Sequence, residues 1–304
     1  MIHILRPATI IIASLLFLAA TPPRASPSPG EIVENAPAAD WSAIAADDLL
    51  IIDFDNGSRV VIALAPAFAP VHVANIKALA RAGWFNGITI NRVQDNYVTQ
   101  WGDATEKKAL PPIVTNPPAE YERPLAGLDF HAMEFRDAYA ARTGHAGGWP
   151  VASDAAMAWL PHCYGMVGVG RNNPPDTGNG AELYAVIGHG PRHLDRNIAL
   201  VGRVVSGTEA LSALLRGTEQ LGFYKEGTSR PTITAARLSS DMPDAQRPVF
   251  EVMSSGSPSF EHWLAARANR KDEFFIRPAN ALDVCNALPP VRAAHARNEG
   301  SERG

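Results

Sequence analysis

Residues 84–103, with the sequence WFNGITINRVQDNYVTQWGD, decide the fold class of this chain. Two runs rich in apolar residues are separated by the polar residues of a turn, a pattern that predicts two paired β-strands. One arginine (Arg92), one aromatic residue (Tyr97) and one amide (Gln100) recur along the stretch, and we predict that they share one face of the sheet. The stretch pairs no nucleophile with a base and holds no metal cluster. Any chemistry of this stretch must therefore come from the fixed positive charge of Arg92 beside an apolar surface.

The segments around this stretch predict further strands and two helices. Asn56-Gly57 lies between two β-branched runs, which is a strong hairpin signal. Pro70 suits the first turn of a helix whose apolar residues recur at helical spacing until Gly83. A second helix is predicted over 207–216, and the predicted strands are 49–54, 59–64, 88–93, 97–101, 164–169, 182–187, 199–204 and 232–238. Since strands and helices do not alternate, we predict a closed antiparallel barrel rather than a doubly wound sheet.

Composition narrows the class of protein. Apolar residues make up 46% and charged residues 19% of the 304 positions, which is typical of a globular chain with a good core. The net charge of −4 supplies no basic field that could displace counterions from phosphates, so a nucleic-acid partner is not expected. Neither a complete dinucleotide-binding glycine motif nor a serine-hydrolase elbow is present.

The N-terminus predicts export. His3 and Arg6 precede an apolar run at 8–20, which small residues follow, as in a secretory signal peptide. The run is too short for a comfortable membrane span, and the prolines beyond it end the helix. We therefore predict a signal peptide over 1–25, an exported and periplasmic protein, and no stable membrane span in the mature chain. Cleavage after Ala20 or Ala25 stays open, and an uncleaved anchor is the competing interpretation.

The remaining segments lack strong periodicity. Residues 26–47 are rich in Pro, Ala and Ser and are predicted to be a flexible linker. Residues 104–162 are predicted to be an enlarged loop region with a short helix near 152–160. A C-terminal extension of unknown role covers 241–292, with strands at 249–253 and 274–276 and a helix at 259–268 capped by a serine, before a disordered tail at 293–304.

Cys163 and Cys285 are the only cysteines of the chain. In an exported protein they could form one disulfide that ties the extension to the main domain. Two buried free thiols are the alternative, and the sequence leaves both open.

Four ordered motifs resemble the cyclophilin-type peptidyl-prolyl isomerases. The motifs are APVHVAN at 69–75, GWFNG at 83–87, the stretch from Arg92 to Asp103, and HLD at 193–195 leading into VGRVVSG at 201–207. Each motif is weak alone, but their order and spacing over about 48–240 match the family together. The resemblance implies an eight-stranded cyclophilin-like barrel capped by two helices, with a small C-terminal α/β extension outside it.

The resemblance also implies roles for individual residues. Arg92 matches the catalytic arginine of the family and Gln100 the glutamine that orders it. The residues that match the substrate-binding groove are Tyr97, Val98, Glu182, Leu183, Tyr184, His193, Leu194 and Ile198. For Val98 and Leu183, a place in the barrel core is at least as plausible an interpretation. Glu182 could pair with Arg92, holding or masking it, or could face solvent.

Several positions depart from the family pattern. Asn91 stands where the family has histidine, Glu182 where it has glutamine, and Ile198 where it has histidine. His193 stands where eukaryotic members have tryptophan and many bacterial members have histidine. These changes put the rate and the substrate preference in doubt more than the fold. His189, His193 and Asp195 are spaced like metal ligands, but Gly190-Pro191 between them predicts a turn, so we expect no metal.

The resemblance implies a cofactor-free enzyme, which we expect to be a monomer. Its partners would be proline-containing segments of unfolded chains or loops, whose Xaa-Pro bonds it would rotate during the folding of exported proteins. A non-catalytic proline-peptide-binding or chaperone-like module is the main alternative. A scaffold for one particular partner, built on the long loop and the extension, is a third.

Overall fold

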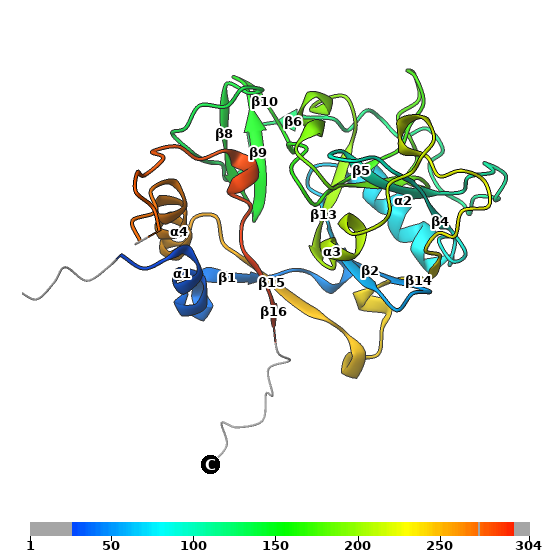
Figure 1. The fold of residues 1–304 in the computed structure, drawn as a ribbon, viewed down its shortest axis with the longest axis horizontal. Coiled ribbons are helices and arrows are strands. Elements are labelled where there is room, and N and C mark those ends of the chain that lie inside the picture. The colour runs from blue at the N-terminus through cyan, green and yellow to red at the C-terminus, as the bar shows by residue number, and fades with distance from the viewer. Residues whose placement is uncertain (1–25, 273, 295–304) are drawn as a thin grey trace, which may run out of the picture.

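The computed structural model of the chain describes residues 26–272 and 274–294. Its largest part is an antiparallel sheet of eight strands in the order β14-β2-β3-β13-β11-β12-β5-β4 (Figure 1). The strands are β2 (Leu49–Phe54), β3 (Arg59–Leu64), β4 (Thr89–Val93), β5 (Val98–Gly102), β11 (Met166–Val169), β12 (Leu183–Val186), β13 (Leu200–Ser206) and β14 (Ile233–Leu238). At the two ends of the sheet, Ile90 N donates to Pro231 O (3.1 Å) and Ile233 N to Ile88 O (2.8 Å). The sheet is thus a nearly closed barrel, which confirms the predicted fold class.

The first hairpin shows how local sequence sets the register. Gly57 adopts a φ of 82°, a left-handed conformation that a glycine reaches without steric cost. The turn brings Asp53 opposite Arg59, and Arg59 Nε donates to the carboxylate at 2.5 Å. The strands β2 and β3 then run antiparallel with alternate side chains in the barrel interior.

Two helices send apolar side chains into the barrel. Helix α2 (Pro70–Arg81) begins at a proline, as predicted, and ends before Gly83, which has a φ of 64°. Its buried Val73, Ile76 and Leu79 join the interior cluster. Helix α3 (Thr208–Ser212) is shorter than predicted and contributes Leu211 to the same cluster.

The region 104–162 contains a second sheet rather than only loop. Its five strands have the order β6-β10-β9-β8-β7, and they are β6 (Arg123–Pro124), β7 (His131–Ala132), β8 (Arg142–Ala146), β9 (Trp149–Ser153) and β10 (Met157–Trp159). The helix expected near 152–160 is wrong. Asp154 turns the chain there, because its carboxylate accepts from the backbone N–H groups of Ala156 (3.1 Å) and Met157 (2.9 Å).

The N-terminal segment 26–47 is ordered, so its prediction as a flexible linker is wrong. Helix α1 (Pro29–Asn35) begins with a capping box, in which Ser28 N donates to Glu31 Oε2 (2.7 Å) and Glu31 N to Ser28 Oγ (3.3 Å). Strand β1 (Trp41–Ala43) pairs antiparallel with β15 (Val249–Met253) of the extension. Composition alone missed this order because the partner strand lies some 200 residues away.

The C-terminal extension completes this third sheet, β1-β15-β16, with β16 at Val291–Ala294. The predicted strand at 249–253 and the helix are confirmed, the latter as α4 (Pro258–Ala268), where Ser257 Oγ accepts from Phe260 N at 3.2 Å. Helix α4 lies beside α1 (Figure 1), but residues 274–276 form no strand. Positions 293 and 294 of the predicted tail belong to β16, and 295–304 lie outside the described residues.

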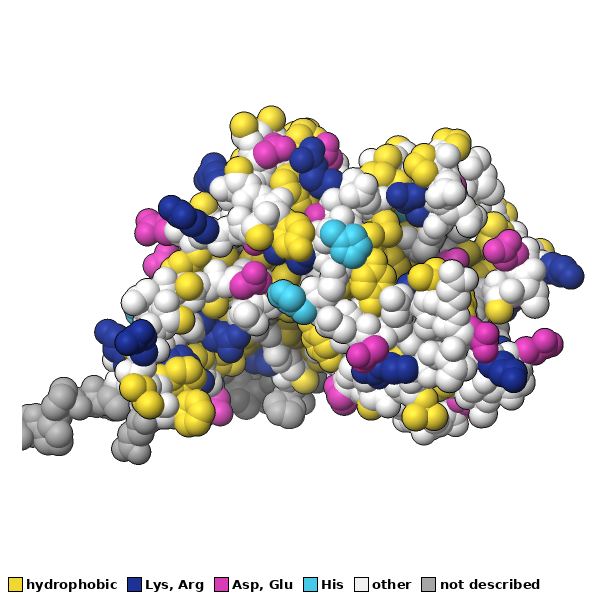
Figure 2. Space-filling model, turned by 45° about the horizontal axis from the view of Figure 1, so that its top comes forward, with side chains coloured by type: hydrophobic (Ala, Val, Ile, Leu, Met, Phe, Trp, Pro, Cys, Tyr) yellow, Lys and Arg dark blue, Asp and Glu magenta, His cyan; other side chains and the backbone are white. Residues whose placement is uncertain are grey.

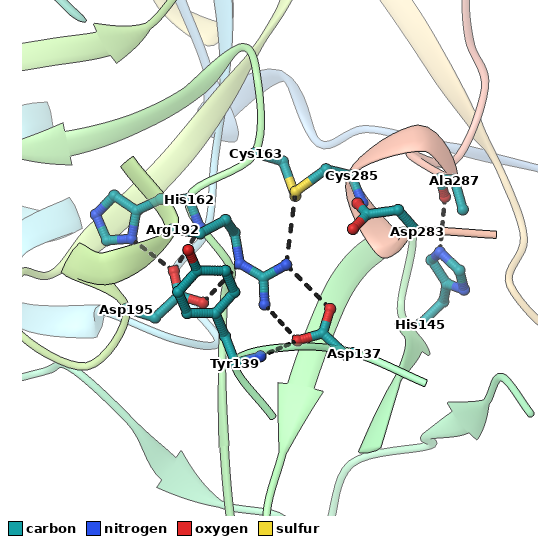
Figure 3. Close-up of a disulfide and its surroundings, with 10 residues drawn as sticks. All are labelled: Asp137, Tyr139, His145, His162, Cys163, Arg192, Asp195, Asp283, Cys285 and Ala287. Carbon is teal, nitrogen blue, oxygen red and sulfur yellow. Dashed lines mark hydrogen bonds and ion pairs between the residues drawn. A yellow bond between two sulfur atoms is a disulfide. The ribbon is translucent and has the colours of Figure 1, made fainter. Parts of the chain in front are cut away.

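A disulfide joins Cys163 to Cys285 across 122 positions of sequence (Figure 3). It decides between the two alternatives for the cysteines and ties the extension to the segment before β11.

On the face drawn in Figure 2, basic and acidic side chains are interspersed, in keeping with the small net charge. The predicted signal peptide, 1–25, lies outside the described residues. Within the described ranges, no helix is long and apolar enough to span a bilayer.

Candidate active site

Arg92 lies opposite Gln100 in the antiparallel pair of β4 and β5. Arg92 Nη1 donates to Gln100 Oε1 at 3.0 Å, and Arg92 Nε donates to the backbone O of Leu221 at 2.6 Å. The second terminal nitrogen donates to Gln94 Oε1. Three of the five guanidinium N–H groups are thus held, and the plane of the group is fixed.

The surroundings of Arg92 keep the cation half-buried. The rings of Tyr97 and Phe223 each lie 5.6 Å from its guanidinium carbon, a cation–π distance. Burial lowers the pKa of Arg92 from its usual value, although Tyr97 and Glu182 act in the opposite direction. An arginine stays protonated at neutral pH despite such a shift. The site therefore presents a permanent positive charge that is partly shielded from water.

A cavity of about 350 Å³ opens beside Arg92. Its polar lining comes from Arg92, Gln94, Gln100 and Arg171. Its apolar lining comes from Tyr97, Val98, Tyr184, Leu194, Ile198 and Leu221, with Gly170 between the two sides. Seven predicted site residues, from three separated motifs, thus meet around one hollow. The cavity can hold a small apolar ring against the guanidinium.

Three predicted groove residues do not line this cavity. Leu183 belongs to the barrel interior cluster, so the barrel-core alternative holds for it. The reason is the alternation of the strand, which turns Leu183 inward when its neighbour Tyr184 faces the cavity. His193 lies beside the cavity, where its ring stacks on Tyr97 at 5.8 Å and its Nε2 lies 3.2 Å from the Tyr97 hydroxyl.

Glu182 lies behind Gln100 rather than in the cavity. Gln100 Nε2 donates to Glu182 Oε1, so Glu182 reaches Arg92 through the amide and does not mask the guanidinium. Burial raises the pKa of Glu182, whereas the bond from Gln100 lowers it and Arg92 adds to that lowering. The carboxylate also borders a second hollow of about 210 Å³. The hydrogen bond between Gln100 Nε2 and the Glu182 carboxylate fixes which end of the Gln100 amide faces Arg92.

Helix α2 positions the loop that leads into β12. Asn75 is buried, and its Nδ2 donates to Asn179 O (3.0 Å) and to Val114 O (2.7 Å). Val114 N returns a bond to Asn75 Oδ1 at 3.0 Å. The amide in the motif at 69–75 therefore anchors the loop that carries Glu182 and leads into the strand of Tyr184.

Sequence reasoning missed four lining residues: Gln94, Gly170, Arg171 and Leu221. Gln94 could have been found, because it lies two residues after Arg92 and therefore on the same face of the strand. Leu221 gave no such signal, since it comes from a loop some 130 residues away. Among the described residues, no group of three His, Cys, Asp or Glu side chains gathers as a metal site would require.

The sequence model of the family described as cyclophilin type peptidyl-prolyl cis-trans isomerase/CLD matches residues 49–237, which is more than half of the chain. This chain is a cyclophilin-type isomerase. The matched segment contains α2, α3 and the eight strands of the barrel, apart from the last residue of β14. It also contains all residues that line the cavity beside Arg92.

Proteins of Brucella suis and Brucella abortus, each named a probable peptidyl-prolyl cis-trans isomerase, are 29% and 28% identical to this cyclophilin over 187 residues. The alignments cover 62% of this chain and 79% of each relative. The crystal structure of cyclophilin AquaCyp293 from Hirschia baltica superposes with a TM-score of 0.66 at 24% identity, over 83% of this chain and 93% of that one. At that identity the likeness concerns the fold. Because 83% exceeds the share matched by the family model, the structural match extends beyond the barrel segment.

Proposed function

We propose that this cyclophilin accelerates rotation about Xaa-Pro bonds by holding the Arg92 guanidinium against the prolyl nitrogen. The observation that carries the proposal is the orientation of Arg92. Three N–H groups are bound to Gln94, Gln100 and Leu221, and the group borders a cavity with an apolar side. Within the part of the chain that the structure describes, two N–H groups are left to face a substrate.

The chemistry of the reaction fits such a site. The peptide C–N bond has partial double-bond character, and its rotation barrier is about 18–20 kcal/mol. In the twisted transition state the prolyl nitrogen becomes pyramidal and regains a lone pair. A cation placed at that nitrogen stabilises the twisted state more than the planar one, which lowers the barrier. No covalent bond breaks, so neither a nucleophile nor a cofactor is required.

The apolar side of the cavity holds the proline ring while the preceding carbonyl turns. Tyr97, Leu194 and Ile198 would contact the ring and displace the water that stabilises the planar amide. Ile198, which stands where the family has histidine, makes this side of the cavity more apolar, which supports a pocket for the proline ring.

The test is cis–trans exchange of an Ala-Pro-Phe peptide, measured by NMR with the purified protein. We expect Arg92→Ala to slow catalysed exchange by about 10²–10³-fold, the typical cost of one transition-state donor. Arg59→Ala is the matched control, because Arg59 is an exposed arginine that pairs with Asp53 on the first hairpin. Full activity in Arg92→Ala would refute the mechanism. Saturable peptide binding without exchange would identify the chain as a binding module.

We also propose that the protein is exported to the periplasm and acts on chains that fold there. The apolar run at 8–20 supports this, as does the Cys163–Cys285 disulfide, because disulfides persist mainly in oxidising compartments. The test is cell fractionation followed by N-terminal sequencing of the recovered chain. A protein that stays in the cytoplasm with its first residues attached would contradict the proposal.

A further inference from the structure

The hydroxyl of Tyr184 has a buried histidine as its partner. Tyr184 lines the cavity with its ring but is only 4% exposed, so its hydroxyl needs an internal hydrogen bond. That partner is His162 Nε2, at 2.9 Å, and the two rings are nearly parallel at 12°. His162 is 1% exposed and lies outside the cavity.

The partners of His162 determine its tautomer. Its Nδ1 lies 3.0 Å from Asp195 Oδ1, and its backbone N donates to the same oxygen at 2.8 Å. An ionised carboxylate only accepts hydrogen bonds, so Nδ1 carries the proton and Nε2 offers its lone pair to the Tyr184 hydroxyl. Burial lowers the pKa of His162 in spite of the Asp195 contact, which keeps the ring neutral.

Asp195 is itself held by a buried ion-pair chain (Figure 3). Arg192 Nε donates to Asp195 Oδ2 at 2.9 Å, and Arg192 Nη2 donates to Asp137 Oδ1 at 2.8 Å. The side chains of Arg192, Asp137 and Asp195 are 3%, 3% and 6% exposed. Asp137 lies between β7 and β8, so this series of ion pairs connects the residues beside the cavity to the second sheet.

The disulfide restrains the same segment. Cys163 directly follows His162 and is bonded to Cys285 of the extension. Arg192 Nη1 lies 4.0 Å from Cys285 Sγ, beside the same disulfide. The His162 backbone is therefore held by Asp195 on one side and by the disulfide on the other.

We propose that His162 is a positioning residue of the isomerase pocket, which holds the Tyr184 ring at the cavity wall through its hydroxyl and is fixed by Asp195, Arg192 and Asp137. The inference rests on the proposed function, because it concerns the placement of the proline ring beside Arg92. It gives the second sheet and the extension a role in the geometry of the pocket. A small displacement of a pocket wall is costly, since catalysis depends on the alignment of the bound ring.

A double-mutant cycle in the full chain tests this, with His162→Leu, Tyr184→Phe and both together. We expect His162→Leu to lower kcat/KM about tenfold, the fold-change that corresponds to one buried hydrogen bond. In the Tyr184→Phe background the same substitution should change kcat/KM less than about twofold. His162→Gln, which keeps an acceptor near the Nε2 position, should restore most of the loss. An equal loss in both backgrounds would overturn the proposal, because His162 would then act through general stability.

A second measurement does not depend on activity. Side-chain ¹⁵N NMR of His162 at neutral pH should show a protonated Nδ1 and an unprotonated Nε2, and the opposite tautomer would overturn the proposal. If the wild-type protein shows no exchange, the proposed catalysis fails. In that case, the dissociation constant of the peptide is measured for the wild type, the two single variants and the double variant. Coupling between His162→Leu and Tyr184→Phe supports the inference, and additive effects refute it.

Discussion

Gln100 orders Arg92 from the neighbouring strand: Arg92 Nη1 donates to Gln100 Oε1 over 3.0 Å, and the two residues are paired in the register of β4 and β5. The other end of the amide donates to Glu182, so the oxygen is forced toward the guanidinium. Glu182 and Gln100 together thus set the orientation of the Arg92 guanidinium, which is the only charge that the proposed mechanism uses.

Gln100→Ala should lower the isomerase rate about tenfold or more, because the guanidinium loses one of its three anchors and gains rotational freedom. Exchange spectroscopy on a prolyl peptide, together with its dissociation constant, measures the effect. Gln246→Ala is a suitable control, since Gln246 is exposed in a turn of the C-terminal extension. An unchanged rate in Gln100→Ala would show that Gln94 and Leu221 suffice to hold Arg92.

Glu182→Gln should stabilise the fold at neutral pH and leave the isomerase rate within about twofold. Burial raises the pKa of Glu182, so the folded state binds this proton more tightly than the unfolded state. The carboxyl therefore favours folding at pH values below its unfolded pKa and disfavours it as the pH rises through the folded pKa. Urea unfolding at several pH values should show the advantage of the amide growing between about pH 4 and 7.

Glu182→Ala provides the comparison for that prediction. It removes the acceptor of Gln100 Nε2, whereas Glu182→Gln keeps an oxygen in place. We expect a severalfold lower rate in Glu182→Ala. A faster enzyme in either variant would mean that Glu182 masks Arg92, contrary to the contacts described above.

His145 should make the protein less stable in acid. Burial, together with Arg203 and His131, lowers its pKa to about 4, against the hydrogen bond to Ala287 O. Its neutral form is favoured in the fold, so stability is complete above the unfolded pKa of about 6.5 and declines as the pH falls toward 4. The loss is on the order of 3 kcal/mol, and His162 adds to it in the same direction.

The check is the pH dependence of the unfolding free energy in the wild type and in His145→Gln. Glutamine can still donate to Ala287 O but does not titrate, so its slope between pH 6.5 and 4 should be shallower. Equal slopes in the two proteins would place the acid sensitivity elsewhere.

Removal of the disulfide should lower stability by about 2–5 kcal/mol, because a link across 122 positions restricts the unfolded chain strongly. Cys163→Ala/Cys285→Ala is compared with the wild type by denaturant unfolding with and without reductant. The wild type should lose stability on reduction, whereas the double variant should not respond. Alkylation and mass measurement confirm the redox state, and a reductant-insensitive wild type would contradict the prediction.

Local sequence patterns were enough to predict the strands and turns of the barrel. The Asn56-Gly57 turn, the alternation along its strands and the proline at the start of α2 depend on neighbours within a few residues, and each is found where predicted. The motif at 84–103 likewise predicted two paired strands with Arg92 and Gln100 on one face, and the structure adds that the two residues are direct partners in the register. The cap at Ser257 is a local signal of the same kind.

Local sequence patterns did not predict the contacts between residues that are distant in sequence. The error at 152–160 was of another kind, because the Asp154 turn joins β9 to β10, which are adjacent in sequence, and its hydrogen bonds are local. Residues 26–47 have the composition of a spacer, yet β1 pairs with β15 far along the chain. Leu221, which fixes Arg92 Nε, and His162, which holds Tyr184, carry no periodicity that would mark them.

The amino-acid sequence by itself determined the barrel, its family and the identity of the cation, because hydrophobic alternation, turn residues and short motifs act over a few positions. Only the tertiary structure decided which way the Gln100 amide faces, that Leu183 turns inward, that the two cysteines are joined, and that His162 supports the pocket. Those features depend on which distant side chains meet in a buried space. There each donor and acceptor must find a partner, and the partner is chosen by packing rather than by sequence proximity.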